Sequence, residues 1–366
     1  MAEKETFSQK LEKARQEGNK LLEMQILSEY GNQLLQAGDA NRAIDLLRRA
    51  LSISTQVGDR NSQVNILGNL GTAYGHSERL DEAIQYFKQA LAIHTDIEDK
   101  KGEAADLHNL GNIYSSLGEY SKAEEYYQKA LSIKDDTNDK RGVASTLANL
   151  ATVYSSQGNP AEAIENYQKA ISISQELNDS YGLAVYLSNL GATYRDLGEV
   201  EKAKNSLQRS LAIMEEIFGK SHPYVATTLS NLGSLYQSQG DYVQAKRCFD
   251  RALEIQEYVL GKEHPATASI YSNLGLLMMD MGQLGKAKEY LETALSISQK
   301  MLGDNHPDTA QSLNNLALLY WQQGNYAEAR KLFKKSLKIL EMVLGVDHPS
   351  VRLVKNNIAS LNAESK

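Results

Sequence analysis

An Asn-Leu-Gly motif recurs along the chain at nearly constant intervals, and this periodicity constrains the fold more than any other feature. The interval is 40 residues as far as 189 and 42 residues from 189 to 357, with Glu29-Tyr30-Gly31 in the equivalent place upstream. A period of this length is typical of proteins built from stacked supersecondary units. The copies, in which Ile or Ala sometimes replaces Leu or Gly, begin at Asn69, Asn109, Asn149, Asn189, Asn231, Asn273, Asn315 and Asn357.

Each repeat carries apolar residues at helical spacing in two successive segments, as at Leu70 and Tyr74 and then at Ala83 and Phe87. This spacing predicts two amphipathic helices per repeat. A glycine marks the turn between them, and the polar residue after it is suited to cap the second helix. Glu78 takes the glycine position once; the other turns have Gly38, Gly118, Gly158, Gly198, Gly240, Gly282 and Gly324.

Small residues recur where the two helices of a hairpin must approach closely, and a larger side chain there would cost about 1–3 kcal/mol in overpacking. In the first helix they are Gly31, Gly71, Gly111, Ala151, Gly191, Gly233, Gly275 and Ala317. In the second helix they are Ala43, Ala83, Ala123, Ala163, Ala203, Ala245, Ala287 and Ala329. The recurring tyrosines, such as Tyr74 and Tyr114, are predicted to fill the remaining core volume.

A single hairpin cannot bury both of its apolar faces, so its stability depends on stacking against neighbours. We therefore predict an all-α solenoid of about eight helix-turn-helix hairpins with half-repeat caps at both ends, forming one domain over 1–366. Within it we expect a half-repeat helix at 4–19, 40-residue repeats at 20–180, mainly 42-residue repeats at 181–349 and a capping helix at 350–366.

The recurring Leu, Gly, Tyr, Ala and Phe positions resemble the tetratricopeptide repeat over almost the whole chain. The 40-residue units, with connectors such as 138–142, resemble spindle-orientation adaptors rich in Leu-Gly-Asn repeats, and "LGKEHPATASIYSNLG" at 260–275 resembles kinesin light chain. The resemblance implies a right-handed superhelix whose concave wall, lined by first helices, holds peptides of partner proteins. The adaptors' G-protein-binding motifs and the motor's heavy-chain-binding coiled coil do not occur in this sequence, so neither cellular role carries over.

Composition excludes several other classes of function. The net charge of −7, with acidic and basic residues interspersed, argues against a nucleic-acid binder. The polar N-terminus lacks the apolar core of a signal peptide, no apolar run reaches membrane-spanning length, and Cys248 is the only cysteine. We expect a cytoplasmic protein without membrane insertion.

No motif for catalysis, phosphate binding or metal binding stands out, so we expect no enzyme, no catalytic residue, no metal and no cofactor. The recurring His-Pro pairs at 222, 264, 306 and 348 follow a glycine and precede the next first helix, where proline suits the opening turn. Their histidines lie a whole repeat apart, too far for one metal centre. Cys248 and Met278 are expected to be packing residues.

The repeated asparagines need a separate explanation, because asparagine is a mediocre helix former. An asparagine one residue before the core Leu points obliquely off the buried stripe. Its carboxamide offers a donor and an acceptor, which match one peptide unit of a bound chain. We predict that a ladder of Asn69, Asn109, Asn149, Asn189, Asn231, Asn273 and Asn315 contacts a bound peptide. The alternative is that these amides hydrogen-bond one repeat to the next, and both roles are compatible.

Residues near each asparagine on its helix should share the groove. Most are small or hydroxylated, which leaves room for a ligand; Asn112 and the single clear cation Arg195 belong to this set. Towards the C-terminus Leu276, Leu318 and Trp321 make the predicted surface more apolar, and a hydrophobic anchor of the ligand is expected there.

These observations favour a non-enzymatic scaffold that binds an extended or helical segment of a partner protein in its groove. The alternative is a regulatory or sensor module in which a peptide changes the superhelix shape and so controls a partner enzyme. We expect a monomer; the unpaired faces of the terminal half-hairpins make weak self-association a third hypothesis.

Overall fold

The structure, a computed structural model, describes residues 6–364, and these residues form eighteen α-helices and no strand. The Cα packing divides the chain into a first unit that ends at Asp139 and a second that begins at Lys140. Residues 4 and 5 of the predicted N-terminal helix, and 365 and 366 of the predicted capping helix, lie outside the described residues. The prediction of one domain over 1–366 therefore stays a prediction.

The helices follow one another with only short connections. The first unit contains α1 (Phe7–Gln16), α2 (Lys20–Gln36), α3 (Ala40–Val57), α4 (Arg60–His76), α5 (Leu80–Asp96), α6 (Lys100–Ser116) and α7 (Tyr120–Asp136). The second contains α8 (Lys140–Ser156), α9 (Pro160–Glu176), α10 (Ser180–Asp196), α11 (Val200–Phe218), α12 (Pro223–Ser238), α13 (Tyr242–Val259), α14 (Pro265–Asp280), α15 (Leu284–Leu302), α16 (Pro307–Gln322), α17 (Tyr326–Leu344) and α18 (Pro349–Glu364).

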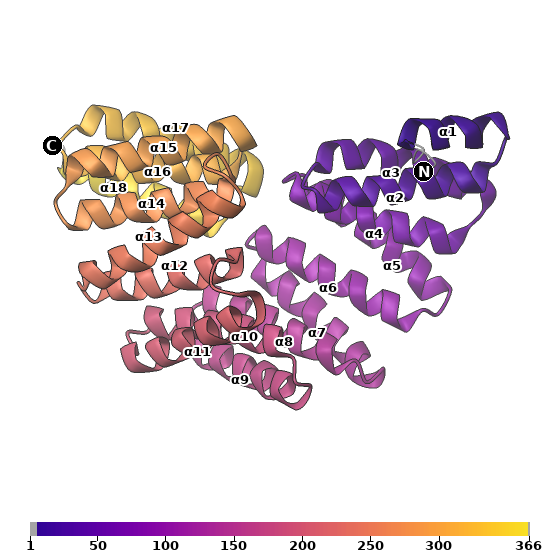
Figure 1. Cartoon of the computed structure of the whole chain (residues 1–366), viewed down its shortest axis with the longest axis horizontal. Helices are drawn as coiled ribbons and strands as arrows, with labels where there is room; N and C mark the ends of the chain where they lie inside the picture. The colour runs from indigo at the N-terminus through magenta and orange to yellow at the C-terminus, as the bar shows by residue number, and fades with distance from the viewer. Residues whose placement is uncertain (1–5, 365–366) are drawn as a thin grey trace. The chain divides into compact units, whose positions relative to one another are not determined.

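Consecutive helices pair into hairpins, from α2 with α3 to α16 with α17, and α1 and α18 are the half-hairpins at the two ends. The predicted eight hairpins with two caps are confirmed for the described residues. Figure 1 shows successive hairpins stacked within each unit. In the second unit the first helices α8, α10, α12, α14 and α16 also contact one another in series, so they form one layer and their partner helices the other.

The close approach predicted at the small residues is confirmed. A methyl group on Gly111 would lie 2.6 Å from the Tyr127 ring, and one on Gly275 would lie 2.6 Å from Leu291. The alanines of the second helices are completely buried: Ala43, Ala83, Ala123, Ala163, Ala203, Ala245, Ala287 and Ala329. The two helices of each hairpin can therefore approach closely because the residues at their contact have little or no side chain.

The turns inside the hairpins follow the predicted glycine rule. Gly118 and Gly324, for example, have positive φ angles of 71° and 76°, and Glu78 adopts 55° in the same place at a steric cost of roughly 1 kcal/mol. The predicted capping by the next residue is confirmed at Asp39, Asp241 and Asn325. It is wrong at Glu119, Asn159, Glu199 and Gln283, whose side chains make no cap hydrogen bond.

The His-Pro pairs form the start of α12, α14, α16 and α18. Each proline is the first helical residue, as predicted. Each histidine Nδ1 accepts a hydrogen bond from the backbone N–H two residues later, at 3.3 Å for His222 and 3.1 Å for His264, His306 and His348. The imidazole therefore takes the place of the usual Asn or Ser cap, which accounts for the recurrence of histidine in these connectors.

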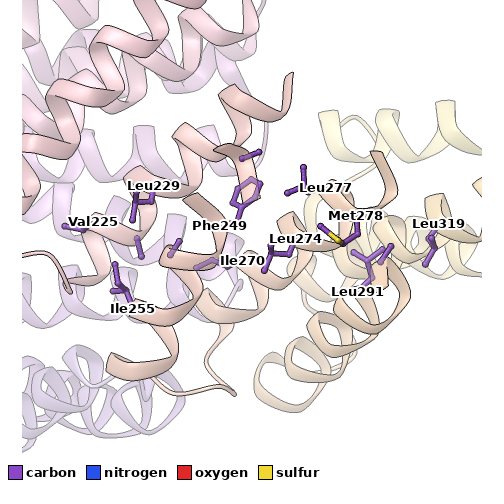
Figure 2. Close-up of a cluster of buried hydrophobic side chains, with 14 of the residues drawn as sticks. Val225, Leu229, Phe249, Ile255, Ile270, Leu274, Leu277, Met278, Leu291 and Leu319 are labelled. Atoms are coloured by element: carbon purple, nitrogen blue, oxygen red, sulfur yellow. The ribbon is translucent and has the colours of Figure 1, made fainter. Parts of the chain in front are cut away.

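The core of the second unit continues from one hairpin to the next. Figure 2 shows Val225 and Leu229 of α12 near Phe249 and Ile255 of α13, followed by Leu274 of α14. Met278 is 1% exposed, which confirms its predicted core position. No helix among the described residues combines the length and the apolar character that crossing a bilayer requires.

Candidate functional site on the first helices

The side chains of the repeated asparagines lie beside the buried stripe of each first helix. The leucine that follows the asparagine is buried, as at Leu70, Leu110 and Leu274, while Asn69, Asn109 and Asn273 are only half-buried. The amide thus lies where the core meets the face of the first-helix layer. This placement is the one that the repeat pattern predicts.

Four of these amides have no hydrogen-bond partner for their side chains within residues 6–364. They are Asn69, Asn109, Asn189 and Asn273, and we call them the free amides. All four are half-buried, so part of each carboxamide is shielded from water while part stays accessible. A half-buried polar group without a partner is available for an external donor or acceptor.

Other amides bind within the stack, and we call them the tied amides. Asn231 Nδ2 donates to Ser188 Oγ at 3.0 Å, from α12 to α10, and Asn357 Nδ2 donates to Asn314 Oδ1 at 3.0 Å, from α18 to α16. Asn315 is 6% exposed and accepts from Gln311 at 3.0 Å. Asn149 on α8 is half-buried and is itself engaged. Hydrogen bonding from one repeat to the next, one of the two roles weighed for the asparagines, thus occurs at Asn231 and Asn357. Contact of the free amides with a ligand stays a prediction.

Asn112 and Arg195 are also engaged in the structure. Asn112 Oδ1 accepts a hydrogen bond of 2.6 Å from the hydroxyl of Tyr127, whose side chain is 2% exposed. Arg195 binds the carboxylate of its neighbour Asp196 through Nε at 2.9 Å and Nη2 at 2.7 Å. The sequence held a signal for the first contact, because a buried tyrosine hydroxyl needs a partner.

The predicted apolar residues line two hollows in the second unit. The smaller, about 270 Å³, is lined by residues of α14, α15 and α16, among them Asn273, Asn315, Ser272 and Leu276. The larger, about 660 Å³, is lined by Leu276, Leu318, Met279, Trp321, Tyr326, Gln237, Gln322, Gly324, Asp280 and Glu364. Leu276 borders both, so a free amide, two leucines and the tryptophan lie on one continuous surface.

Sequence reasoning did not identify Asp280 and Glu364 as part of this surface. Glu364 Oε2 accepts a hydrogen bond of 2.7 Å from Trp321 Nε1, and Asp280 Oδ2 accepts one of 2.6 Å from Gln237 Nε2. Both contacts join residues 43 positions apart. In each pair the two residues are separated by one 42-residue repeat plus one residue. The repeat period alone could therefore have predicted that Trp321 lies near Glu364 and Gln237 near Asp280.

The first unit places ionisable groups close to its amides. The Asp106 carboxyl is 3% exposed and lies 2.6 Å from His94 Nδ1, and burial raises the pKa of Asp106 to about 6. On the same helix, burial and the positive charge of Lys134 lower the pKa of His108 to about 3. The His108 imidazole next to Asn109 is therefore neutral at pH 7.

Comparisons with known proteins found several similar solved structures. Similar solved structures include the apo form of the quorum sensor NprR from B. thuringiensis, 17% identical, covering 87% of this chain and 88% of that chain with a TM-score of 0.63. Another is aspartyl phosphate phosphatase F from Bacillus subtilis, 20% identical, covering 80% and 75% with a TM-score of 0.64. A third is BtubC from P. vanneervenii, 24% identical, covering 64% and 93% with a TM-score of 0.48.

No curated protein matches the sequence. The sequence model of the tetratricopeptide repeat matches residues 22–96, 62–136, 103–176, 142–216, 182–257, 224–279, 266–342 and 315–366. Because these matches together cover nearly all of the sequence, the chain belongs to the tetratricopeptide repeat family.

Proposed function

We propose that this protein is a non-enzymatic scaffold that binds an extended or helical segment of a partner protein along its first helices. In this proposal the free amides of each unit, Asn69 and Asn109 in the first and Asn189 and Asn273 in the second, hydrogen-bond the main chain of a partner. The observation that carries it is that these amides are half-buried, accessible and without a side-chain partner in the described residues. Tetratricopeptide repeats in general support protein–protein interaction.

The geometry of a peptide supports the same proposal. Neighbouring first helices lie about 10 Å apart, and an extended chain rises ~3.3 Å per residue. A bound segment thus presents a peptide group to successive helices about every three residues. Each hydrogen bond contributes only ~1 kcal/mol, so the side chains beside the amides, such as Leu276 and Leu318, supply the specificity.

The test is the double substitution Asn189→Ala with Asn273→Ala in a pull-down from the native lysate. Loss of two hydrogen bonds should lower the capture of true groove partners on the order of tenfold. Asn205→Ala is the matched control, because Asn205 is an exposed asparagine on the second helix α11. Unchanged capture of every partner by the double variant, at an unchanged melting temperature, contradicts the proposal.

A second candidate function is a regulatory module that changes shape when it binds a peptide and so controls a partner enzyme. It is favoured by the likeness in fold to a protein described as a quorum sensor. Small-angle X-ray scattering with and without a captured peptide separates the two candidates. Identical profiles favour the rigid scaffold, whereas a change in the radius of gyration favours the regulatory module.

We also propose that the chain is monomeric and acts on protein or peptide partners in the cytoplasm. Light scattering over a range of concentrations measures whether the terminal half-hairpins associate. A molar mass that rises with concentration would indicate self-association.

A further inference from the structure

The larger hollow of the second unit, lined by ten residues from Gln237 to Glu364, has a distinctly apolar floor. Leu276, Met279 and Leu318 are half-buried there and come from the adjacent helices α14 and α16. Trp321 closes one side, and its indole packs edge-on against Phe333 with ring centroids 6.3 Å apart. A volume of about 660 Å³ is enough for a large side chain of a ligand.

Among residues 6–364, the charged side chains that line this hollow are both acidic. Asp280 and Glu364 line it, both are exposed, and no Lys, Arg or His is among the residues that line it. Arg330, one turn beyond Tyr326 on α17, donates to Asn362 Oδ1 at 3.0 Å and is not among the lining residues. The two carboxylates thus face a potential ligand without a neutralising cation among the lining residues.

Each carboxylate already accepts one hydrogen bond, from Trp321 or from Gln237. These bonds fix the orientation of the carboxylates. They leave acceptor positions unused, because two carboxylate oxygens accept about four hydrogen bonds. The arrangement combines an apolar socket with two oriented anionic acceptors at its edge.

We propose that this hollow selects a peptide segment in which a large apolar side chain stands next to a lysine or arginine. The apolar side chain fills the socket against Leu276 and Leu318, and the cation binds at the carboxylates of Asp280 and Glu364. An acidic segment is disfavoured by repulsion at the same rim. This inference rests on the proposed function, because it names the class of partner for one part of the proposed groove.

The test uses Trp321, the only tryptophan in the chain, whose fluorescence reports directly on this hollow. Three short glycine-serine peptides carry a central Leu-Lys, Leu-Glu or Ser-Lys pair and are titrated separately into the full-length protein. The Leu-Lys peptide should shift the emission of Trp321 and bind about tenfold more tightly than the Leu-Glu peptide, with a preference that weakens at high salt. The Ser-Lys peptide should bind more weakly than Leu-Lys because it cannot fill the socket.

Matched variants locate the effect. Asp280→Asn should weaken binding of the Leu-Lys peptide about threefold and leave the Leu-Glu peptide unchanged or slightly improved. Asp347→Asn, which removes an exposed carboxylate from the α17–α18 connector, should change neither. Equal affinity for Leu-Lys and Leu-Glu overturns the inference, as does an unaltered preference in Asp280→Asn.

Failure of this inference is distinguishable from failure of the proposed function. If no peptide shifts the Trp321 emission while capture from lysate still depends on Asn189 and Asn273, the inference is wrong and the scaffold proposal stands. If neither measurement responds, both are wrong.

Discussion

The first-helix layers around α4–α6 and around α14–α16 are built from the same repeat but differ in what surrounds their amides. In the first unit, Asn69 and Asn109 are free, and the buried Asp106 carboxyl and the half-buried His108 imidazole lie on the same helix as Asn109. In the second, Asn273 is free and Asn315 is tied, and Leu276 borders two hollows. The repeat thus sets the position of the amide, while its neighbours decide its availability and surroundings.

The largest expected difference between the two regions is the response to acid. The pKa of His108 is about 3 in the folded protein and about 6.5 when unfolded. Between pH 6.5 and pH 3 the His108 imidazole is protonated in the unfolded chain but stays neutral in the folded protein. The free energy of unfolding therefore decreases as the pH falls through this range. At pH 4 the loss should be on the order of 3 kcal/mol.

Thermal unfolding followed by circular dichroism at pH 7 and pH 4 measures this loss. The His108→Gln variant should show a smaller decline in melting temperature than the wild type, while the exposed-site control His76→Gln should decline as the wild type does. The raised pKa of Asp106, about 6, works in the opposite direction between pH 6 and 4, which is why the comparison is made between variants. Parallel declines in wild type and His108→Gln would show that His108 is not responsible.

A smaller difference is expected from adding a methyl group at the helix contacts. Gly111→Ala meets the Tyr127 ring and Gly275→Ala meets Leu291, both at 2.6 Å. The ring is rigid and also bound to Asn112, whereas a leucine changes rotamer more easily. Gly111→Ala should therefore cost about 2 kcal/mol of unfolding free energy and Gly275→Ala about 1 kcal/mol. Urea denaturation measures both, and the reverse order would show that hydrogen bonding of the ring does not stiffen this contact.

The smallest expected effect separates tied from free amides. Asn231→Ala removes the hydrogen bond to Ser188 and should cost about 1 kcal/mol. Asn273→Ala removes no side-chain hydrogen bond among the described residues and improves helix propensity, so its stability should be unchanged or slightly higher. In the pull-down, the order should invert, with Asn273→Ala losing more capture than Asn231→Ala. Equal stability losses in urea would remove the distinction between the two classes of amide.

Much of the candidate site could be predicted from the sequence. The period located the seven asparagines of the predicted ladder beside buried leucines, and Leu276, Leu318 and Trp321 do lie together around one hollow. The sequence did not indicate which of the repeated asparagines are engaged within the protein, as Asn231 and Asn315 are, and it led us to place Asn112 in the groove although Asn112 is engaged as well. Their partners are Ser188, Gln311 and Tyr127, and these contacts depend on the rotamers and identities of side chains that vary from repeat to repeat.

The sequence by itself determined the hairpins, their number, the turns and the close helix contacts, because in a stacked repeat these depend on neighbours within one period. Gly111 against Tyr127 and the proline that opens α14 are examples. Only the tertiary structure decided which amides are free. It also decided that Asp280 and Glu364 lie at the edge of an apolar hollow. The physical reason is that hydrogen bonds between side chains of adjacent repeats require alignment within about half an ångström, and the identity of each partner is not part of the repeating pattern.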